Sequence, residues 1–164
     1  IYRRRTRPAV SSWPAESIRV ANWTSRFWGR RLVNEMDDAR AREIIARATA
    51  RADELGVSIC IAVVDAGAHL KAFLRMDGAF AGAVDVAQRK ARTSALFPME
   101  SGDFGRMIAD EGLLGMEQSN GGLMGFDGGV PVLDGTVQVG AVGVSGATAQ
   151  QDRDIARYAA GEDI

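Results

Sequence analysis

Residues 57–78 read VSICIAVVDAGAHLKAFLRMDG. The first part, 57–65, is apolar at almost every position, which predicts a strand buried on both faces in the middle of a sheet. Asp65-Ala66-Gly67 is a turn signal, and residues 68–76 follow it as the returning strand of a hairpin. This stretch therefore predicts an antiparallel pair around which the rest of the sheet is built.

The second strand of this hairpin should divide its side chains between two faces, because successive residues of a strand point in opposite directions. One face would carry Leu70, Ala72, Leu74 and Met76, and the other would carry His69, Lys71, Phe73 and Arg75. The second face combines one aromatic ring with three groups that can bear positive charge.

Helices are expected on either side of the hairpin. Helical spacing of apolar residues predicts helices over 35–55, 79–96, 103–111 and 148–160. Two further strands, 130–133 and 136–144, are separated by Asp134-Gly135, a hairpin turn signal. Hairpins alternate with helices, so we expect an α+β fold with an antiparallel sheet covered by helices, not a doubly wound parallel sheet.

Composition limits the function. The 164 residues are 46% hydrophobic and 25% charged, which is typical of one globular domain. The longest apolar run, Ile59 to Val64, is too short to cross a membrane, and we expect no membrane partner. A single cysteine, Cys60, excludes an internal disulfide, and a single histidine, His69, excludes most zinc sites.

Residues 1–34 differ from the rest and are predicted to form a basic, Trp-containing arm ahead of a domain over 35–164. Eight arginines stand against Glu16 within residues 1–31, whereas the remainder is acidic. Arginine with tryptophan suits single-stranded nucleic acid, but the acidic body would repel phosphate, so we favour oligomer contacts. No apolar signal core follows the arginines, and we expect a cytoplasmic protein; export by a signal removed before Ile1 stays open.

Two glycine-rich segments have two interpretations each. GAVGVSG, residues 140–146, runs from a strand toward a helix, where backbone N–H groups bind anions; the alternative is close packing of a neighbouring helix or subunit. NGGLMGFDGGVP, residues 120–131, lacks the Lys-Ser/Thr of a phosphate loop. It either lines a ligand cleft or simply connects two elements.

Three blocks together resemble the GlcG/HbpS family, which includes the C-terminal domain of PduO-type cobalamin adenosyltransferases. They are AVVDAGAHLKAFLRMDGA (62–79), KARTSALF (90–97) and GGVPVLDGTVQVGAVGVSGATAQQD (128–152). The resemblance implies a profilin-like α/β/α fold with a five-stranded antiparallel sheet. It also implies homo-oligomers, from dimers to octamers, and haem binding in several members.

The family pattern carries over to particular residues of this chain. The matching positions are Asp65, Gly67, Arg75, Met76, Asp77, Gly78, Lys90, Gly121, Gly122, Gly140, Gly143, Ser145, Gly146 and Asp152. His69 lies where family members vary. The histidines that known members use for haem lie nearer the N-terminus, and this chain has none there.

Two hypotheses about a small ligand follow, beside a third in which the protein is a structural or interaction protein whose basic arm drives assembly. Whether the protein is an enzyme stays open. In the first, it is a small-ligand-binding protein whose ligand is haem or another tetrapyrrole. His69 would then bind the iron, Arg75 and Lys90 would pair with carboxylates, and the remaining candidate binding residues would be Gly121, Gly122, Gly143 and Ser145.

The second hypothesis is a cofactor-independent enzyme that acts on a small oxo- or hydroxy-acid by acid–base or isomerase-type chemistry. Its catalytic candidates are Lys90 and Asp77, with Arg75 helping to hold the substrate and the backbone of 143–148 holding its carboxylate.

Overall fold

The computed structural model describes residues 35–161 and confirms the predicted order of helices and hairpins. The elements are α2 (Asp38–Leu55), β1 (Cys60–Asp65), β2 (Leu70–Arg75), α3 (Ala83–Leu96), α4 (Ser101–Asp110), the 3-10 turn η1 (Met116–Gln118), β3 (Gly129–Asp134), β4 (Val137–Ser145) and α5 (Ala149–Ala160). The predicted basic arm, 1–34, lies outside the described residues. None of the helices in the described part is long and apolar enough to cross a membrane.

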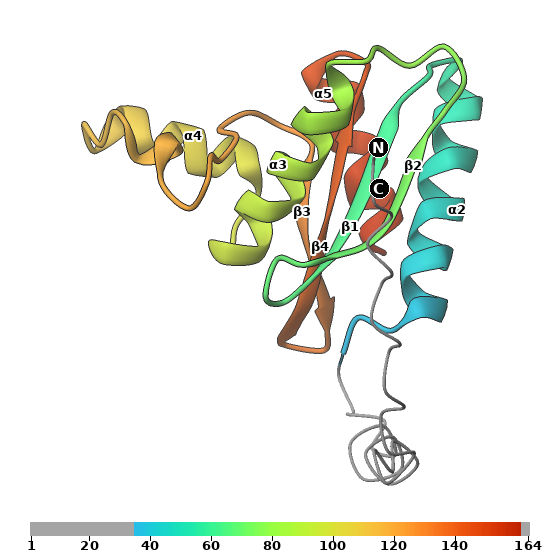
Figure 1. Ribbon diagram of the computed structural model, residues 1–164, viewed down its shortest axis with the longest axis horizontal. Helices are drawn as coiled ribbons and strands as arrows, with labels where there is room; N and C mark the ends of the chain where they lie inside the picture. Colours follow the sequence, from blue (N-terminus) through green and yellow to red (C-terminus); the bar gives the residue numbers. More distant parts are fainter. Residues whose placement is uncertain (1–34, 162–164) are drawn as a thin grey trace, which may run out of the picture. The chain divides into compact units, whose positions relative to one another are not determined.

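The strands form one antiparallel sheet in the order β2-β1-β4-β3, as Figure 1 shows. This confirms an α+β fold built on an antiparallel sheet, with β1 in the interior as its apolar sequence predicts. Between residues 35 and 161 the sheet has four strands, whereas the family resemblance implied five.

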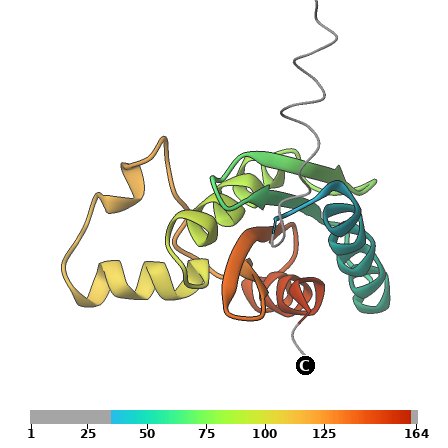
Figure 2. The ribbon, with the colours of Figure 1, turned by 90° about the horizontal axis from the view of Figure 1, so that it is seen from below.

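Helices cover both faces of this sheet (Figures 1 and 2). On one face, Ile59, Ile61 and Val63 share a buried cluster with apolar residues of α2 and α5. On the other face, Cys60 and Ala62 pack against alanines of α3. Adjacent side chains of β1 thus pack into apolar clusters on opposite faces of the sheet, which is why this strand has no polar position before Asp65.

α3 packs closely on the sheet because the residues between them are small. Gly143 of β4 faces Ala87 and Ala91 of α3, and a Cβ atom at position 143 would overlap the carbonyl oxygen of Ala87. The same atom would come within 2.5 Å of the amide nitrogen of Ala91. The structure therefore supports the close-packing interpretation of Gly143.

A β-bulge changes the predicted faces of β2. Val63 pairs with Ala72 but Val64 pairs with Leu70, so Lys71 is the extra residue of the bulge. Ala72, Leu74 and Met76 pack on the α2 and α5 side, as predicted. The prediction for Leu70 is wrong, because beyond the bulge Leu70 faces α3, while Lys71 pairs with Asp38 of α2 at 3.2 Å.

Residues 97–127, which we call the α4 arm, project from the sheet and its covering helices (Figures 1 and 2). The arm has a small core of its own, in which Phe104, Ile108 and Leu123 are buried. Its far end exposes apolar side chains: Leu114 is 85% exposed and Leu113 is 44% exposed.

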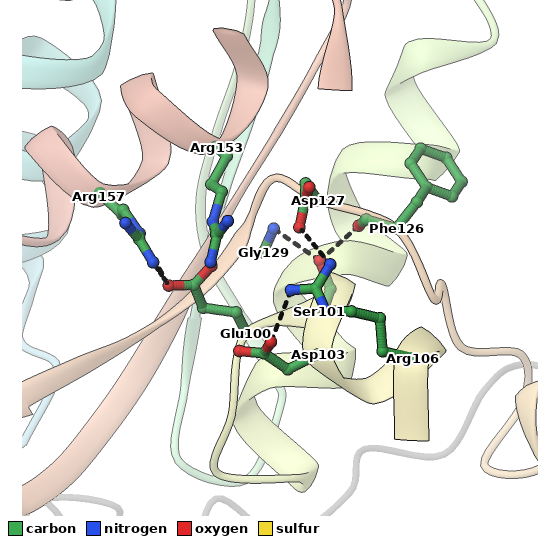
Figure 3. A network of polar contacts seen from close by, with 9 residues as sticks. All are labelled: Glu100, Ser101, Asp103, Arg106, Phe126, Asp127, Gly129, Arg153 and Arg157. Carbon is green, nitrogen blue, oxygen red and sulfur yellow. Dashed lines mark hydrogen bonds and ion pairs between the residues drawn. The ribbon is translucent and has the colours of Figure 1, made fainter. Parts of the chain in front are cut away.

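A polar network fixes the base of the α4 arm (Figure 3). Glu100, just before α4, accepts hydrogen bonds from Arg153 at 2.6 Å and from Arg157 at 2.5 and 2.8 Å, both on α5. The hydroxyl of Ser101 donates to the carbonyl of Phe126 at 2.6 Å and accepts from the amide of Gly129 at 2.8 Å. These bonds join the two ends of the arm to each other and to α5.

Replacing Glu100 with alanine should loosen the arm while the sheet stays folded. Loss of these charge-assisted hydrogen bonds should lower the free energy of unfolding by about 2 kcal/mol. We expect faster hydrogen exchange at α4 amides and unchanged exchange at α2 amides. Asp103→Ala, which removes an exposed ion pair with Arg106 inside the arm, is the control and should alter exchange little. Equal exchange in the two variants would contradict this role for Glu100.

Candidate functional site

A hollow of the described surface lies between the β1–β2 hairpin, α3 and the segment that follows the α4 arm's tip. We call it the hairpin pocket, and its volume is about 380 Å³. It is lined by Val64, Ala68, Leu70, Asp85, Gln88, Arg89, Arg92, Gly121 and Gly122. This volume is within the range of small-molecule sites.

The two sides of the hairpin pocket differ in chemistry. The hairpin side presents the apolar side chains of Val64, Ala68 and Leu70, and Leu70 faces the pocket only because of the bulge at Lys71. The α3 side presents Arg89 and Arg92, with Asp85 and Gln88 beside them. An apolar wall opposite guanidinium groups suits a ligand with an apolar body and anionic substituents.

The two arginines of the pocket are held in different ways. Arg89 donates from Nε to Asp85, one helical turn before it, at 2.6 Å. Arg92 donates from Nε to the carbonyl of Asn120 at 2.9 Å, which ties the glycine-rich segment to α3. No carboxylate lies within ion-pair distance of Arg92 among the described residues.

His69 lies beside the hairpin pocket and outside its lining. Its neighbours in sequence, Ala68 and Leu70, both line the pocket, while its own side chain is 83% exposed. The ring packs over Gly67, and Nδ1 lies 3.2 Å from Oδ1 of Asp65. The same oxygen accepts hydrogen bonds from the amides of Gly67 and His69, so Asp65 organises this turn.

Lys90 occupies a different environment from the pocket arginines next to it. It is fully buried, and its Nζ donates to Asp152 of α5 at 2.7 Å and to the carbonyl of Val144 at 2.9 Å. The ring of Phe126 lies 4.6 Å from Nζ. Burial lowers the pKa of Lys90 and raises the pKa of Asp152, while their mutual attraction opposes both shifts.

The other predicted site residues lie outside the hairpin pocket. Arg75 donates from Nε and Nη2 to the carbonyl of Ala79, at 3.1 and 2.8 Å. Ser145 is buried at the end of β4. In the sheet, Cys60 of β1 pairs with Ser145 on one side and with Arg75 of β2 on the other. Asp77 is exposed in the turn after β2, and Gly143 lies beneath α3.

The structure thus brings together only part of the predicted set. Gly121 and Gly122 line the pocket, with His69 beside it. Arg89 and Arg92 were missed, although their spacing of three residues within the predicted 79–96 helix places them on one face. Their importance comes from the distant segment that packs over them, and local periodicity gives no sign of that contact.

Comparisons with known proteins agree with this fold. The sequence pattern of the family described as "Haem degrading protein HbpS-like" matches residues 36–161. Protein GlcG of Escherichia coli is 40% identical over 106 residues, covering 64% of this chain and 77% of GlcG. The chain therefore belongs to the GlcG/HbpS family, as the three sequence blocks indicated.

Two solved structures show the same fold. The Klebsiella pneumoniae protein ORFY superimposes with a TM-score of 0.74 at 29% identity, over 80% of this chain and 92% of ORFY. A PduOC:heme complex superimposes with a TM-score of 0.72 at 25% identity, over 77% of this chain and 93% of PduOC.

Proposed function

We propose that this protein binds haem or another tetrapyrrole in the hairpin pocket. The observation that carries the proposal is the pairing of an apolar wall, made by Val64, Ala68 and Leu70, with the guanidinium groups of Arg89 and Arg92. A tetrapyrrole has the matching division between an apolar ring system and carboxylate side chains. The family match and the similarity to a PduOC:heme complex support the same ligand.

The donor set of the chain fits haem better than a free metal ion. Among residues 35–161, no three His, Cys, Asp or Glu side chains are grouped so that they could hold a metal ion. Haem needs fewer protein ligands, because the porphyrin supplies four nitrogens and the protein adds one or two axial ligands. Bound haem would supply redox-active iron.

His69 is the residue we assign to the iron. It is the single histidine of the sequence, and its neighbours Ala68 and Leu70 line the pocket. Its own side chain is paired with Asp65 on the other face of the hairpin, and it would have to turn toward the pocket to reach the iron.

Neither Lys90, which is buried, nor Arg75, whose Nε and Nη2 both donate to the carbonyl of Ala79, lines the pocket. Arg89 and Arg92 line it and therefore take the carboxylate-pairing role that the sequence suggested for those two residues.

The alternative function, an acid–base enzyme, gains no support from the placement of its candidates. Lys90 is fully buried and paired with Asp152, whereas Asp77 is exposed in a turn. The homo-oligomer implied by the resemblance stays part of our proposal. It is supported by the exposed Leu113 and Leu114 at the end of the α4 arm, since apolar side chains grouped on a surface favour protein contacts.

A titration with haemin tests the proposed function. We expect a saturable Soret shift at one haemin per chain, and an altered ligand-field spectrum with at least tenfold weaker binding for His69→Ala, since the variant loses the axial ligand (about 1.4 kcal/mol per tenfold). Thr136→Ala, an exposed residue in the β3–β4 turn, is the control and should bind like the unmodified protein.

Two results would overturn parts of this assignment. Wild-type spectra that match those of haemin mixed with an unrelated protein would rule out tetrapyrrole binding. Unchanged spectra and affinity in His69→Ala would remove His69 as the ligand and leave the pocket itself in place.

A further inference from the structure

Gly122 leaves the space into which Arg89 extends. A Cβ atom at position 122 would overlap Nη1 of Arg89 and lie 2.9 Å from Cζ. Gly122 also has a φ of +98°, a conformation that residues with side chains rarely adopt. The overlapped atom is the end of a long side chain, so a larger residue at 122 would displace the guanidinium and leave the surrounding backbone in place.

The segment that contains Gly122 is fixed to α3 at several points. Arg92 holds the carbonyl of Asn120, and the hydroxyl of Thr93 accepts a hydrogen bond from the amide of Met124 at 2.8 Å. The amide of Gly122 donates to the carbonyl of Ser119 at 2.9 Å, which closes the turn. Because Arg89 lies on α3 together with Arg92 and Thr93, these bonds also fix the position of Gly122 relative to Arg89.

The guanidinium of Arg89 is only partly satisfied. Its Nε donates to Asp85, and no hydrogen-bond acceptor within the described part of the chain is in reach of Nη1 or Nη2. These two terminal nitrogens carry four N–H donors at the wall of the pocket, and a carboxylate binds such a fork through two parallel hydrogen bonds. Asp85 thus fixes the Nε edge of the Arg89 guanidinium, and Gly122 fixes its Nη1 end. The N–H donors of Nη1 and Nη2 are left for a ligand.

We propose that Arg89 is the residue by which the hairpin pocket recognises a ligand carboxylate, and that Gly122 is the positioning residue that sets its guanidinium. This deepens the proposed function and rests on it. The site would then distinguish a tetrapyrrole with free carboxylates from one whose carboxylates are esterified, because an ester removes the charge and the second acceptor oxygen of the fork.

The test compares haemin with haemin dimethyl ester as probes of the purified protein. The unmodified protein should bind haemin at least tenfold more tightly than the ester. Gly122→Ala should lose most of this preference, through weaker binding of haemin and little change for the ester. Gly115→Ala is the matched control: its φ of +99° matches that of Gly122, nothing lies within 4 Å of its Cβ position, and it does not line the pocket.

A double-mutant cycle shows whether Gly122 acts through Arg89. Arg89→Ala should lose the preference for haemin, and adding Gly122→Ala to it should cause no further loss. Arg89→Lys, which keeps the charge without the fork, should retain an intermediate preference. Circular dichroism and thermal unfolding of Gly122→Ala and Gly115→Ala should match, since the two changes strain the backbone alike.

Each contrary outcome would contradict a different claim. If Gly122→Ala keeps the preference that Gly115→Ala shows, or if its effect adds fully to that of Arg89→Ala, the positioning role is wrong. If the unmodified protein binds haemin and the ester equally, carboxylate recognition by Arg89 is wrong while tetrapyrrole binding stands. If neither probe binds the unmodified protein, the proposed function fails.

Discussion

Replacing Lys90 with methionine is expected to lower the free energy of unfolding by about 3–5 kcal/mol, which is the cost of leaving a buried charge without its partner. Lys90 is fully buried, and the carboxylate of Asp152 is almost so. Methionine has a similar length but cannot donate to Asp152 or to the carbonyl of Val144. The backbone amides of Gly146 and Ala147, the latter 3.0 Å from Oδ1, would still donate to that carboxylate.

Urea denaturation of a small set of variants measures this effect. Lys71→Met is the matched control, because its partner Asp38 is mostly exposed and such pairs contribute about 1 kcal/mol or less. The double variant Lys90→Met/Asp152→Leu should recover much of the loss, since an apolar pair removes the uncompensated charge. A loss for Lys90→Met no greater than that for Lys71→Met would show that the buried pair is not what holds α3 to α5.

The second large effect is expected at Gly143, where alanine should cost about 1–3 kcal/mol or more through overpacking. The new Cβ atom would meet the backbone of α3 at Ala87 and Ala91, which cannot rotate away as a long side chain can. α3 would have to move off the sheet, and the small-residue contact with β4 would open.

Gly82→Ala provides the comparison for Gly143→Ala. Gly82 precedes α3 with a φ of −63°, and nothing lies within 4 Å of its Cβ position. We expect its effect to stay within about 0.5 kcal/mol, because neither the backbone nor the packing opposes alanine there. Thermal unfolding of both variants decides the matter, and an equally mild effect at position 143 would reopen the ligand-binding interpretation of that glycine.

Much of the fold follows from local patterns. The run from Ile59 to Val64 predicted a strand buried on both faces, and β1 is interior to the sheet with helices on either side. Asp134-Gly135 predicted the β3–β4 hairpin, which the strand pairing confirms. The bulge at Lys71 was not foreseen, since an extra residue in one strand is defined only by the partner against which it is counted.

The candidate site was predicted less well than the fold. From the sequence, we expect Arg75, Asp77 and Lys90 to form one binding group. In the structure, Arg75 binds the carbonyl of Ala79, and Lys90 is turned inward to Asp152. Charge in a sequence does not show whether a side chain faces solvent or a buried partner, because that depends on which helix packs above it.

The sequence by itself determined the family, the order of helices and hairpins and the antiparallel character of the sheet, because these depend on periodicity, turn residues and short motifs. Only the tertiary structure decided that Leu70 faces α3, that Lys90 is buried, and that Arg89 and Arg92 lie under Gly121 and Gly122. The contacts that bring the glycine segment onto α3 join residues about 30 apart in the chain. The contacts that bury Lys90 join residues 54 and 62 apart. Such contacts are fixed by packing and by the register of strands, which no local stretch of sequence encodes.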